Sequence, residues 1–332
     1  MSDKLGRPIR DLRISVTDRC NFRCPYCMPK ESFGPGHPFL ADARLMTQPE
    51  LVRIAGAFVG LGVSKVRLTG GEPLLRRDIA EIAGRLKSSL SICDLSLTTN
   101  GWFLEREAAA LRKAGLERVN VSVDAIDEGI AGKMNGRGYS ISRVLAGIDA
   151  AKSEGLLVKV NCVVQRGVNE GQILPLSEYF REKGHTLRFI EFMDVGTTNR
   201  WSMDQVVPAR QIVDTISSVW PVQPVDPAYR GEVASRYRYL DGKGEIGIVS
   251  SVTEPFCRDC NRARLSADGR LFTCLFASTG TDILGPLRSG ADDPQLSAII
   301  SRAWGSRSDR YSEERSEAPQ DGARVEMSYI GG

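Results

Sequence analysis

The stretch DLRISVTDRCNFRCPYC, Asp11–Cys27, joins a short apolar run to three closely spaced cysteines. The run predicts a buried strand, and Cys20, Cys24 and Cys27 follow it with three and then two residues between them. Loops at the carboxyl ends of parallel strands are where α/β proteins bind their ligands. A closed zinc or iron–sulfur site usually has four protein ligands. This trio therefore takes a fourth ligand from elsewhere or leaves one metal position open.

The composition is that of a globular protein with nearly balanced charge. The 332 residues are 42% apolar and 26% charged, with a formal net charge of +3. This balance predicts neither a nucleic-acid partner nor a membrane partner, and no apolar run approaches the ~20 residues that cross a bilayer. The first residues, MSDKLGRPIRDLRISV, lack the apolar core of a signal peptide. We therefore expect a cytoplasmic protein, in which clustered cysteines bind metal more often than they form disulfides.

A strand followed by a helix recurs from Asp11 to about Trp220. After the first strand, the pattern predicts strands over residues 64–70, 94–100, 118–125, 157–164 and 186–193. It predicts helices over residues 47–62 and 77–89, from about 105, from about 142, and over 172–183 and 209–219. The first helix carries a capping box, with Thr47 as N-cap and Glu50 three residues later.

Six alternating units of this kind predict a parallel sheet covered by helices. A doubly wound sheet and a barrel both fit the alternation, but six units are too few for a closed eight-fold barrel. An incomplete, open barrel is the third possibility. After Trp220 the chain is rich in Pro, Gly and short alternating runs, which predicts a smaller region with strands. The stretch from Ser306 is polar, and we expect it to be mobile up to its final residues.

The metal that the first trio binds has two main interpretations. Thiolates suit zinc, copper(I) and iron–sulfur clusters, and His37 could complete a zinc site of three cysteines and one histidine, although the spacing is uncommon for zinc. A [4Fe–4S] cluster held by three cysteines would keep one iron free. CNFRCPYC resembles the signature of the radical S-adenosylmethionine (SAM) superfamily. The resemblance implies that SAM chelates the free iron and that Tyr26 lies beside its adenine.

A glycine pair follows the second predicted strand, in LTGGEPLLR. Gly70 and Gly71 could serve a turn that needs positive φ, or could let the backbone approach a ligand closely. The four residues Gly70–Pro73 resemble the GGEP motif of the same superfamily. In that superfamily the motif receives the methionine amino group of SAM.

A second cysteine trio lies in FCRDCNRARLSADGRLFTC. Two residues separate Cys257 from Cys260, and thirteen separate Cys260 from Cys274. A zinc ribbon with one unseen ligand is one interpretation of this trio, and a second open cluster is the other. Of the remaining cysteines, Cys162 lies in a predicted core strand and suits a small buried side chain, whereas Cys93 shows no partner.

Taken together, the two trios resemble the GTP 3′,8-cyclase (MoaA) family of molybdenum-cofactor biosynthesis. The resemblance extends from LRISVTDRCNFRCPYCMP through RVNVSVDAID, KVNCVVQRGVN and RFIEFM to the closing IGG. It implies an incomplete (β/α)6 TIM-type barrel over residues 1–225. It also implies a smaller C-terminal extension over residues 226–332, with a second [4Fe–4S] cluster whose open iron binds the guanine of GTP. A homodimer and an external one-electron reductant are further implications.

Basic residues occur where the pattern predicts buried strands. No Walker A sequence is present, so a nucleotide would have to be held by side chains. Arg262 and Arg264, as alternate residues of a strand, would point the same way. Unpaired buried cations cost several kcal/mol each, so the set predicts either acidic partners or an anionic ligand. The predicted strands contain Arg13, Lys65, Arg67, Lys159 and Arg188.

The family resemblance also implies roles for individual residues. It implies GTP contacts at Arg13, Lys65, Arg67, Thr98, Lys159, Arg188, Arg262 and Arg264, and SAM contacts at Tyr26, Gly71, Ser122 and Met193. It implies catalytic roles for Cys20, Cys24, Cys27, Arg262, Arg264 and the closing Gly331 and Gly332, which would reach into the active site. In the implied reaction, a 5′-deoxyadenosyl radical removes hydrogen from ribose C3′ of GTP, and C3′ bonds to guanine C8.

Three alternative functions follow from the same residues. The first is another radical SAM enzyme with an auxiliary cluster, of the peptide-maturase type, although such enzymes usually carry more cysteines in this region. The second is an electron carrier with two clusters, which would need four cysteines for each. The third is a zinc-bound scaffold protein. GTP binding, SAM cleavage and iron content distinguish them.

Overall fold

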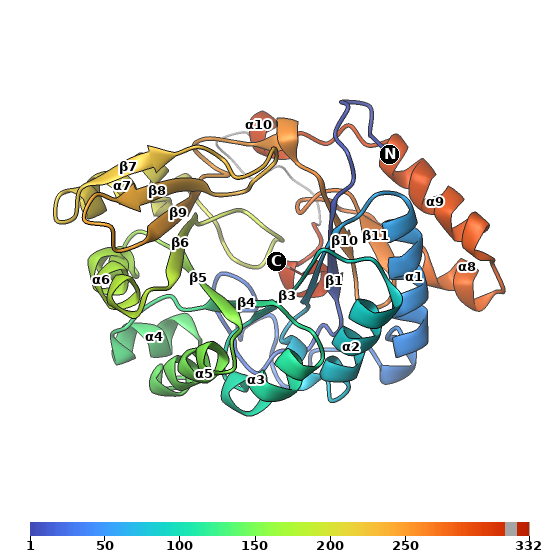
Figure 1. The fold of residues 1–332 in the computed structure, drawn as a ribbon, viewed down its shortest axis with the longest axis horizontal. Coiled ribbons are helices and arrows are strands. Elements are labelled where there is room, and N and C mark those ends of the chain that lie inside the picture. The colour runs from blue at the N-terminus through green and yellow to red at the C-terminus, as the bar shows by residue number, and fades with distance from the viewer. Residues whose placement is uncertain (316–323, 332) are drawn as a thin grey trace.

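One curved sheet of twelve strands organises the chain in a computed structural model that describes residues 1–315 and 324–331 (Figure 1). The first six strands are β1 (Asp11–Ser15), β2 (Lys65–Thr69), β3 (Asp94–Thr99), β4 (Arg118–Ser122), β5 (Leu157–Val164) and β6 (Thr186–Glu191). The C-terminal region adds β7 (Val222–Val225), β8 (Ser235–Tyr239), β9 (Glu245–Val249), β10 (Arg262–Leu265), β11 (Arg270–Phe272) and β12 (Thr281–Asp282).

The order of the strands distinguishes a doubly wound sheet from an open barrel. The first six strands lie side by side in sequence order, without the reversal that marks a doubly wound sheet. The C-terminal region then extends both edges, because β10 pairs parallel to β1 and β9 pairs parallel to β6. Within the described residues no strand pairing joins β9 to β10, so the barrel stays open. The predicted incomplete barrel is confirmed.

The helices cover the outer face of the curved sheet, as Figure 1 shows for α1 to α6. The crossovers contain α1 (Gln48–Gly60), α2 (Ile79–Ser89), α3 (Leu104–Lys113), α4 (Glu128–Met134), α5 (Ser142–Ser153), α6 (Ile173–Lys183) and α7 (Ala209–Ser217). The C-terminal region contains α8 (Leu284–Arg288), α9 (Asp293–Gly305), α10 (Tyr311–Glu314) and α11 (Met327–Ile330). Short 3-10 turns, including η5 (Cys257–Asp259), complete the elements. Among the described residues, every helix is too short or too polar to cross a bilayer.

Local sequence signals explain where several elements begin and how they pack. The predicted capping box is present at α1, where Thr47 and Glu50 cap each other's backbone. Each inner strand buries apolar side chains against the surrounding helices in one continuous core, and Cys162 belongs to that core as predicted. Burial of these apolar faces stabilises the sheet–helix layers.

Two parts of the structure differ from the expectation. Helix α4 was not predicted, because Gly129 and Gly132 weaken its helical pattern, although Asp127 caps it by accepting from the Ile130 N–H. The stretch after Ser306 is more closely packed, where the structure describes it, than its polar composition indicated, since Arg307 is only 4% exposed; its expected mobility stays a prediction. The expected domain boundary at residue 225 falls directly after β7, within the same sheet, and stays a prediction.

The last described residues return to the middle of the barrel. Figure 1 shows the C-terminus inside the ring of strands, whereas α9 lies outside against α1. Helix α11 packs against β1, and Ile330 is fully buried. The chain end therefore contributes to the interior that the strands enclose.

Candidate active site

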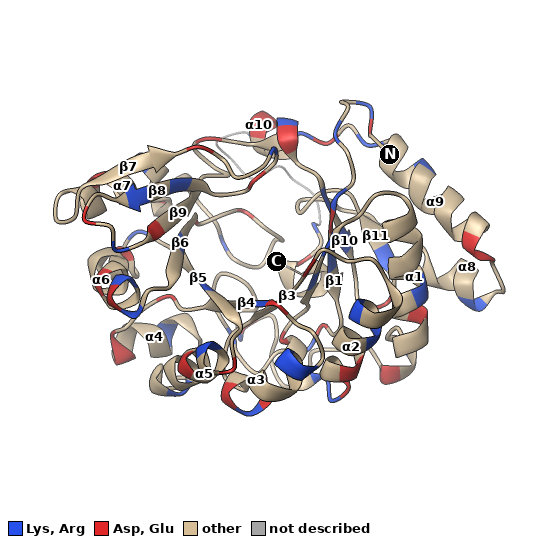
Figure 2. Cartoon of the chain, in the orientation of Figure 1, with Lys and Arg blue, Asp and Glu red and all other residues tan. Residues whose placement is uncertain are grey.

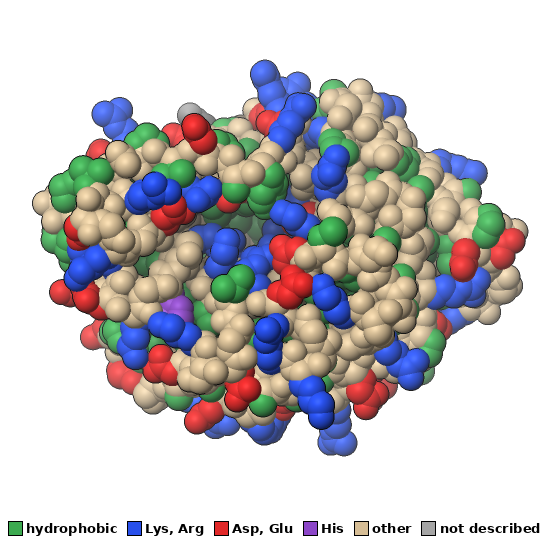
Figure 3. All heavy atoms as spheres, in the orientation of Figure 1, with side chains coloured by type: hydrophobic (Ala, Val, Ile, Leu, Met, Phe, Trp, Pro, Cys, Tyr) green, Lys and Arg blue, Asp and Glu red, His purple; other side chains and the backbone are tan. Residues whose placement is uncertain are grey.

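A cavity of about 660 Å³ occupies the inner side of the sheet, within the size range of small-molecule sites. All six cysteines of the two trios line it, together with residues from β1 to β6 and from the C-terminal region. Figure 3 shows a hollow in this face of the molecule, with Lys and Arg side chains at its opening. The fold thus brings together two trios that are more than 200 residues apart in sequence.

The loop that carries the first trio is held from within by Arg23. Its guanidinium donates to the carbonyls of Cys20, Phe22 and Phe33 at 2.7–2.8 Å. Gly136 lies so close to this loop that a Cβ there would meet the Arg23 carbonyl at 1.9 Å. The loop conformation is therefore set by contacts to the β4–β5 crossover as well as by its own sequence.

The glycine pair after β2 accommodates the chain itself. A Cβ on Gly70 would lie 2.4 Å from the Thr17 carbonyl, and one on Gly71 would lie 2.3 Å from the Arg19 carbonyl. The Gly71 N–H donates to Thr17 at 2.7 Å, and Gly71 also lines the cavity. Both glycines thus let β2 support the segment that leads to Cys20, and Gly70, at φ +148°, needs its lack of a side chain.

The first trio suits an iron–sulfur cluster better than a single metal ion. Burial raises the pKa of Cys24 well above its usual value and that of Cys20 to about 12, so these thiols would ionise only on binding a metal. In the part of the chain that is described, no three His, Cys, Asp or Glu side chains gather around one ion position. A cluster needs a wider ligand set, because each cysteine binds its own iron. His37 packs between Phe33 and Phe39 and does not line the cavity.

The four predicted SAM contacts line the same cavity near the first trio. They are Tyr26, Gly71, Ser122 and Met193. Ser122 ends β4, and Met193 lies two residues beyond β6. The Tyr26 hydroxyl donates to Asp124 at 2.7 Å, and Asp124 also accepts from the Val163 N–H at 2.9 Å. These bonds fasten the cysteine loop to the carboxyl ends of β4 and β5.

The second trio is held by two arginines from opposite ends of the chain. Arg7 donates to the Cys257 carbonyl at 2.9 Å, and Arg307 donates to the Cys260 carbonyl at 2.7 Å. Asp3 accepts from Arg7 and lies 3.7 Å from Arg307. Burial alone would raise the pKa of Cys260, but Arg262 and Arg307 lower it to about 6. The pKa of its neighbour Cys274 is raised to about 11, because burial, Asp309 and Cys260 outweigh the opposing effects of the Phe276 N–H and Arg264.

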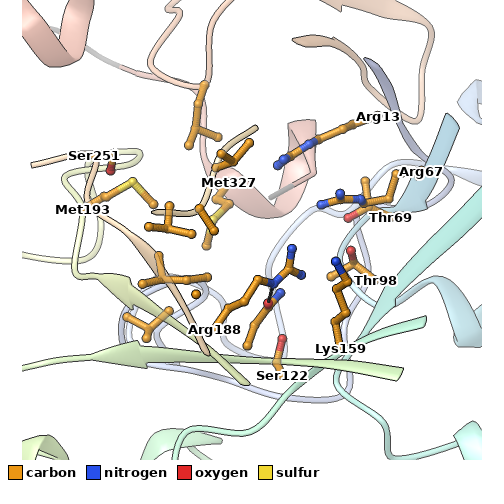
Figure 4. A pocket seen from close by; sticks show the side chains of 18 of the residues that line it. Arg13, Arg67, Thr69, Thr98, Ser122, Lys159, Arg188, Met193, Ser251 and Met327 are labelled. Atoms are coloured by element: carbon orange, nitrogen blue, oxygen red, sulfur yellow. Dashed lines mark hydrogen bonds between the residues drawn. The ribbon is translucent and has the colours of Figure 1, made fainter. Parts of the chain in front are cut away.

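The cavity that both trios line is also lined by cations. Figure 4 shows Arg13, Arg67, Arg188 and Lys159 directing their charged groups into one space. The outer helices, in contrast, carry both signs of charge (Figure 2). All eight predicted GTP contacts line the cavity: Arg13, Lys65, Arg67, Thr98, Lys159, Arg188, Arg262 and Arg264.

These cations have no carboxylate partner among the described residues. The ion pairs of the structure include none of the cavity's predicted GTP contacts. Four buried Nε atoms, those of Arg13, Arg67, Arg262 and Arg264, and the Thr98 hydroxyl lack any hydrogen-bond partner. Buried polar groups are rarely left unpaired, so the cavity has the donors that a polyanion would accept from.

The electrostatics of the cavity reflect this excess of positive charge. Burial and Arg67 lower the pKa of Arg188 to about 9, and burial with Arg188 lowers that of Lys159 to about 8. Burial and Arg262 lower the pKa of Arg264 to about 10. Asp11 lies nearby, where Arg67 and Arg13 hold its pKa below the usual value despite burial. Asp94 and Glu232 also line the cavity, but neither they nor Asp11 forms an ion pair with a predicted GTP contact among the described residues.

The end of the chain forms part of the same wall. Gly331 has φ +73°, and a Cβ there would lie 2.3 Å from Cγ2 of Thr69, which lines the cavity. Met327 lines the cavity too. The expected role of Gly332 lies outside the described residues.

Several supporting residues escaped the sequence analysis. Arg7, Arg23, Asp124 and Arg307 hold the two cysteine loops, but the sequence analysis assigned none of them a role. The position of Arg23 inside the first cysteine motif was the one available signal. Arg7 and Arg307 act on residues some 250 and 47 positions away, which no local pattern reveals.

Two family models match successive parts of the chain. The model described as the radical SAM superfamily matches residues 14–180. The model described as Molybdenum Cofactor Synthesis C matches residues 185–313. The first covers the segment with the first trio and the second covers the segment with the second.

Curated relatives align over essentially the full chain. A GTP 3′,8-cyclase of Acidothermus cellulolyticus is 50% identical over 99% of this chain and 98% of its own length. A GTP 3′,8-cyclase of Xanthomonas axonopodis pv. citri is 52% identical over 100% and 99%. One from Staphylococcus epidermidis is 48% identical over 100% and 99%.

Solved structures support the fold. Streptococcus suis SuiB bound to S-adenosylmethionine superimposes with a TM-score of 0.63 over 89% of this chain and 68% of that chain, at 15% identity. SuiB bound to its precursor peptide SuiA gives a TM-score of 0.63 at 16% identity. At this identity the likeness concerns the fold alone.

Proposed function

The chain belongs to the GTP 3′,8-cyclase family of radical SAM enzymes, and from this premise we propose how its cavity performs the reaction. The product is (8S)-3′,8-cyclo-7,8-dihydroguanosine 5′-triphosphate, the first intermediate of molybdenum-cofactor biosynthesis. The observation that carries the proposal is that both cysteine trios line one cavity together with a set of cations that have no carboxylate partner among the described residues. A homodimer, a cytoplasmic location and an external one-electron reductant stay predictions.

The first trio and its surroundings would hold SAM. Cys20, Cys24 and Cys27 are the proposed ligands of a [4Fe–4S] cluster, which when reduced supplies one electron for cleavage of SAM to methionine and a 5′-deoxyadenosyl radical. Tyr26, Gly71, Ser122 and Met193 are the proposed SAM contacts, all on the wall of the cavity. Asp124 keeps Tyr26 in place and thereby orients the loop toward this wall.

The second trio and the cations would hold GTP. Cys257, Cys260 and Cys274 are the proposed ligands of a second [4Fe–4S] cluster, beside which the guanine binds. Arginine forks suit phosphate oxygens, and Arg13 and Arg67 line the cavity with Nε atoms that have no partner among the described residues.

The cyclisation itself depends on orientation. A hydrogen atom leaves ribose C3′ for the deoxyadenosyl carbon, C3′ bonds to guanine C8, and one electron and one proton complete the product. Because a primary carbon radical attacks any nearby C–H bond, the walls must fix the ribose closely. Arg262 and Arg264, both on β10 and both buried, are the proposed catalytic residues nearest the second trio.

The peptide-maturase alternative has less support. SuiB shares the fold. The precursor peptide bound in one of its structures concerns SuiB and says nothing of what this chain binds. A peptide substrate would not require a cavity whose cations lack acidic partners. The unpaired donors of this chain instead match a triphosphate.

Anaerobic turnover tests the proposed function. Protein reconstituted with iron and sulfide is incubated with SAM, GTP and a strong one-electron reductant, and the products are separated by mass. We expect 5′-deoxyadenosine and a cyclised nucleotide in equal amounts. SAM cleavage that is indifferent to GTP, with no binding of GTP, would show that the substrate assignment is wrong.

The pKa of Lys159 predicts a pH dependence of GTP binding. In the free protein this pKa is lowered to about 8 by burial and by Arg188 and Arg118, against weaker opposition from Glu232 and Asp94. A bound triphosphate raises the pKa again, so binding takes up a proton above pH 8. Affinity should therefore be constant between pH 7 and 8 and then fall by up to about tenfold per pH unit.

The measurement is the dissociation constant of GTP in the absence of SAM, from pH 7 to 9.5. Lys159→Arg removes the group whose pKa is about 8, so the fall should begin about one pH unit higher, where Arg188, with a pKa of about 9, loses its charge. A decline of equal size in the wild type and in Lys159→Arg would contradict the assignment to Lys159.

The packing of Gly331 predicts a strong effect of a single methyl group. In Gly331→Ala the new Cβ would overlap Cγ2 of Thr69, and the backbone conformation, with φ +73° and ψ +125°, would cost about 1–3 kcal/mol more. We expect the chain end to leave its place and the yield of cyclised nucleotide per 5′-deoxyadenosine to fall about tenfold or more, because 1.4 kcal/mol corresponds to tenfold.

Thr69→Ser provides the matched test. It removes the methyl group with which alanine would overlap, so the double variant should recover part of the yield that Gly331→Ala loses. Thr69→Ser alone should resemble the wild type. An unchanged yield in Gly331→Ala would show that this packing does not matter for the reaction.

A further inference from the structure

Asp194 is a buried carboxylate directly after Met193, in the loop that follows β6. Its side chain is only 3% exposed. It has no part in the family motifs or in the assignments above. Its surroundings nevertheless connect three segments that form the cavity wall.

The first connection is to the C-terminal tail, meaning here the described residues 311–315 and 324–331. Arg315 Nε donates to Asp194 Oδ1 at 2.9 Å. Arg324 donates to Oδ2 at 2.9 Å and to the Asp194 carbonyl at 2.7 Å, and the Tyr311 hydroxyl donates to Oδ2. Burial raises the pKa of Asp194, but Tyr311 and Arg315 outweigh it and hold the pKa below its usual value. Asp194 is thus the common acceptor for three tail residues.

The second connection is to the loop of the second trio. The ring of Phe276, two residues after Cys274, stacks on Tyr311 with 4.3 Å between centroids. The Arg315 guanidinium lies over Phe276 at 5.3 Å, and the Val325 N–H donates to the Ala277 carbonyl at 3.3 Å. The residues that bind Asp194 therefore also pack against the segment that carries Cys274.

A second contact fixes the tail to the same loop after β6. Glu326 accepts hydrogen bonds from Thr197 and Thr198 at 2.9–3.1 Å. Gly196, at φ +72°, makes room for this carboxylate, since a Cβ there would meet its oxygen at 2.1 Å. From Glu326 the chain runs on through Met327, which lines the cavity, to Gly331 against Thr69.

We propose that Asp194 is a positioning residue for the cyclisation, which holds the Met193 loop, the Cys274 loop and the C-terminal tail in one arrangement. The proposal rests on the proposed function, because it concerns the walls between the SAM and GTP sites. Loss of the carboxylate leaves two buried arginines without their counter-ion, although each keeps a backbone carbonyl acceptor, and this loss is costly enough to release the tail. A released tail leaves the first trio intact but opens the wall that orients the ribose.

The test compares Asp194→Asn with Asp241→Asn. Asp241 lies on the β8–β9 turn, pairs with Arg181 and does not line the cavity. Its variant therefore controls for the loss of an arginine–aspartate pair. Each reconstituted variant is incubated with SAM and GTP, and cyclised nucleotide per 5′-deoxyadenosine is measured beside the affinity for GTP. For Asp194→Asn we expect the ratio of cyclised nucleotide to 5′-deoxyadenosine to fall about tenfold or more. A hydrogen bond between charged groups contributes more free energy than a tenfold change in this ratio requires. SAM cleavage and iron content should stay near wild type, and Asp241→Asn should keep the wild-type ratio.

Arg315 supplies a second pair of variants in case Asp194→Asn does not fold. Arg315→Met should lower the ratio, and Arg315→Lys, which keeps a cation beside Asp194, should restore most of it. A wild-type ratio in Asp194→Asn, or equal ratios in the two Arg315 variants, would overturn the proposal. Wild-type protein that makes no cyclised nucleotide would instead overturn the proposed function, so the two failures are distinct.

Discussion

Cys24→Ala is expected to abolish cleavage of SAM, so that no 5′-deoxyadenosine forms above background. Cys24 is partly buried and shares its loop with Cys20 and Cys27, and the proposed cluster needs all three thiolates to hold three of its irons. The variant should retain about half of the wild-type iron, since the second trio would still bind its own cluster.

Cys260→Ala should show the opposite separation. It leaves the first trio complete, so SAM cleavage should continue, but no cyclised nucleotide should appear. Cys93→Ala is the matched control, because this cysteine is exposed and lies outside the cavity. Cys24→Ala that still cleaves SAM, or Cys260→Ala that still cyclises GTP, would contradict the roles assigned to the trios.

Arg264→Met is expected to weaken GTP binding and to stabilise the ligand-free protein. Arg264 is 3% exposed, its Nε has no partner, and its pKa is lowered by burial and by Arg262. One hydrogen bond to a charged group is worth about 1.5–3 kcal/mol, so the dissociation constant should rise roughly 10- to 150-fold. Without GTP, removal of a buried cation that Arg262 repels should raise the melting temperature of the protein. Binding sites often lower the stability of the ligand-free protein in this way.

The measurements are GTP affinity by calorimetry and thermal unfolding without nucleotide. Arg270→Met on β11 is the control, because Arg270 is exposed and does not line the cavity. It should change neither quantity appreciably. An Arg264→Met protein that is less stable without GTP and binds it as well as wild type would show that Arg264 has a purely structural role.

Much of the architecture could be predicted because its signals are local. The apolar runs and helical spacing identified the six strand–helix units, and the capping box at Thr47 and Glu50 appears as expected. The six metal-site cysteines stood out by spacing alone. Periodicity could not distinguish a doubly wound sheet from an open barrel. That choice depends on strand order, which is a property of long-range pairing.

The parts that escaped prediction are held by contacts between distant segments. β9 and β10 extend opposite edges of the sheet, although only residues 250–261 separate them. Asp194 reaches three tail residues more than 110 positions away. The polar composition after Ser306 indicated a mobile segment. Composition does not reveal that the arginines of this segment pair with Asp194.

The central claim is that the two trios share one cavity, so that a radical formed from SAM at the first reaches the ribose of GTP held at the second. Turnover with GTP deuterated at C3′ tests it most directly, with 5′-deoxyadenosine analysed by mass spectrometry. The account predicts that this deuterium appears in the 5′-deoxyadenosine, and that no deuterium transfers from GTP labelled only at C2′. 5′-Deoxyadenosine without deuterium, formed while [3′-²H]GTP is consumed, would contradict it.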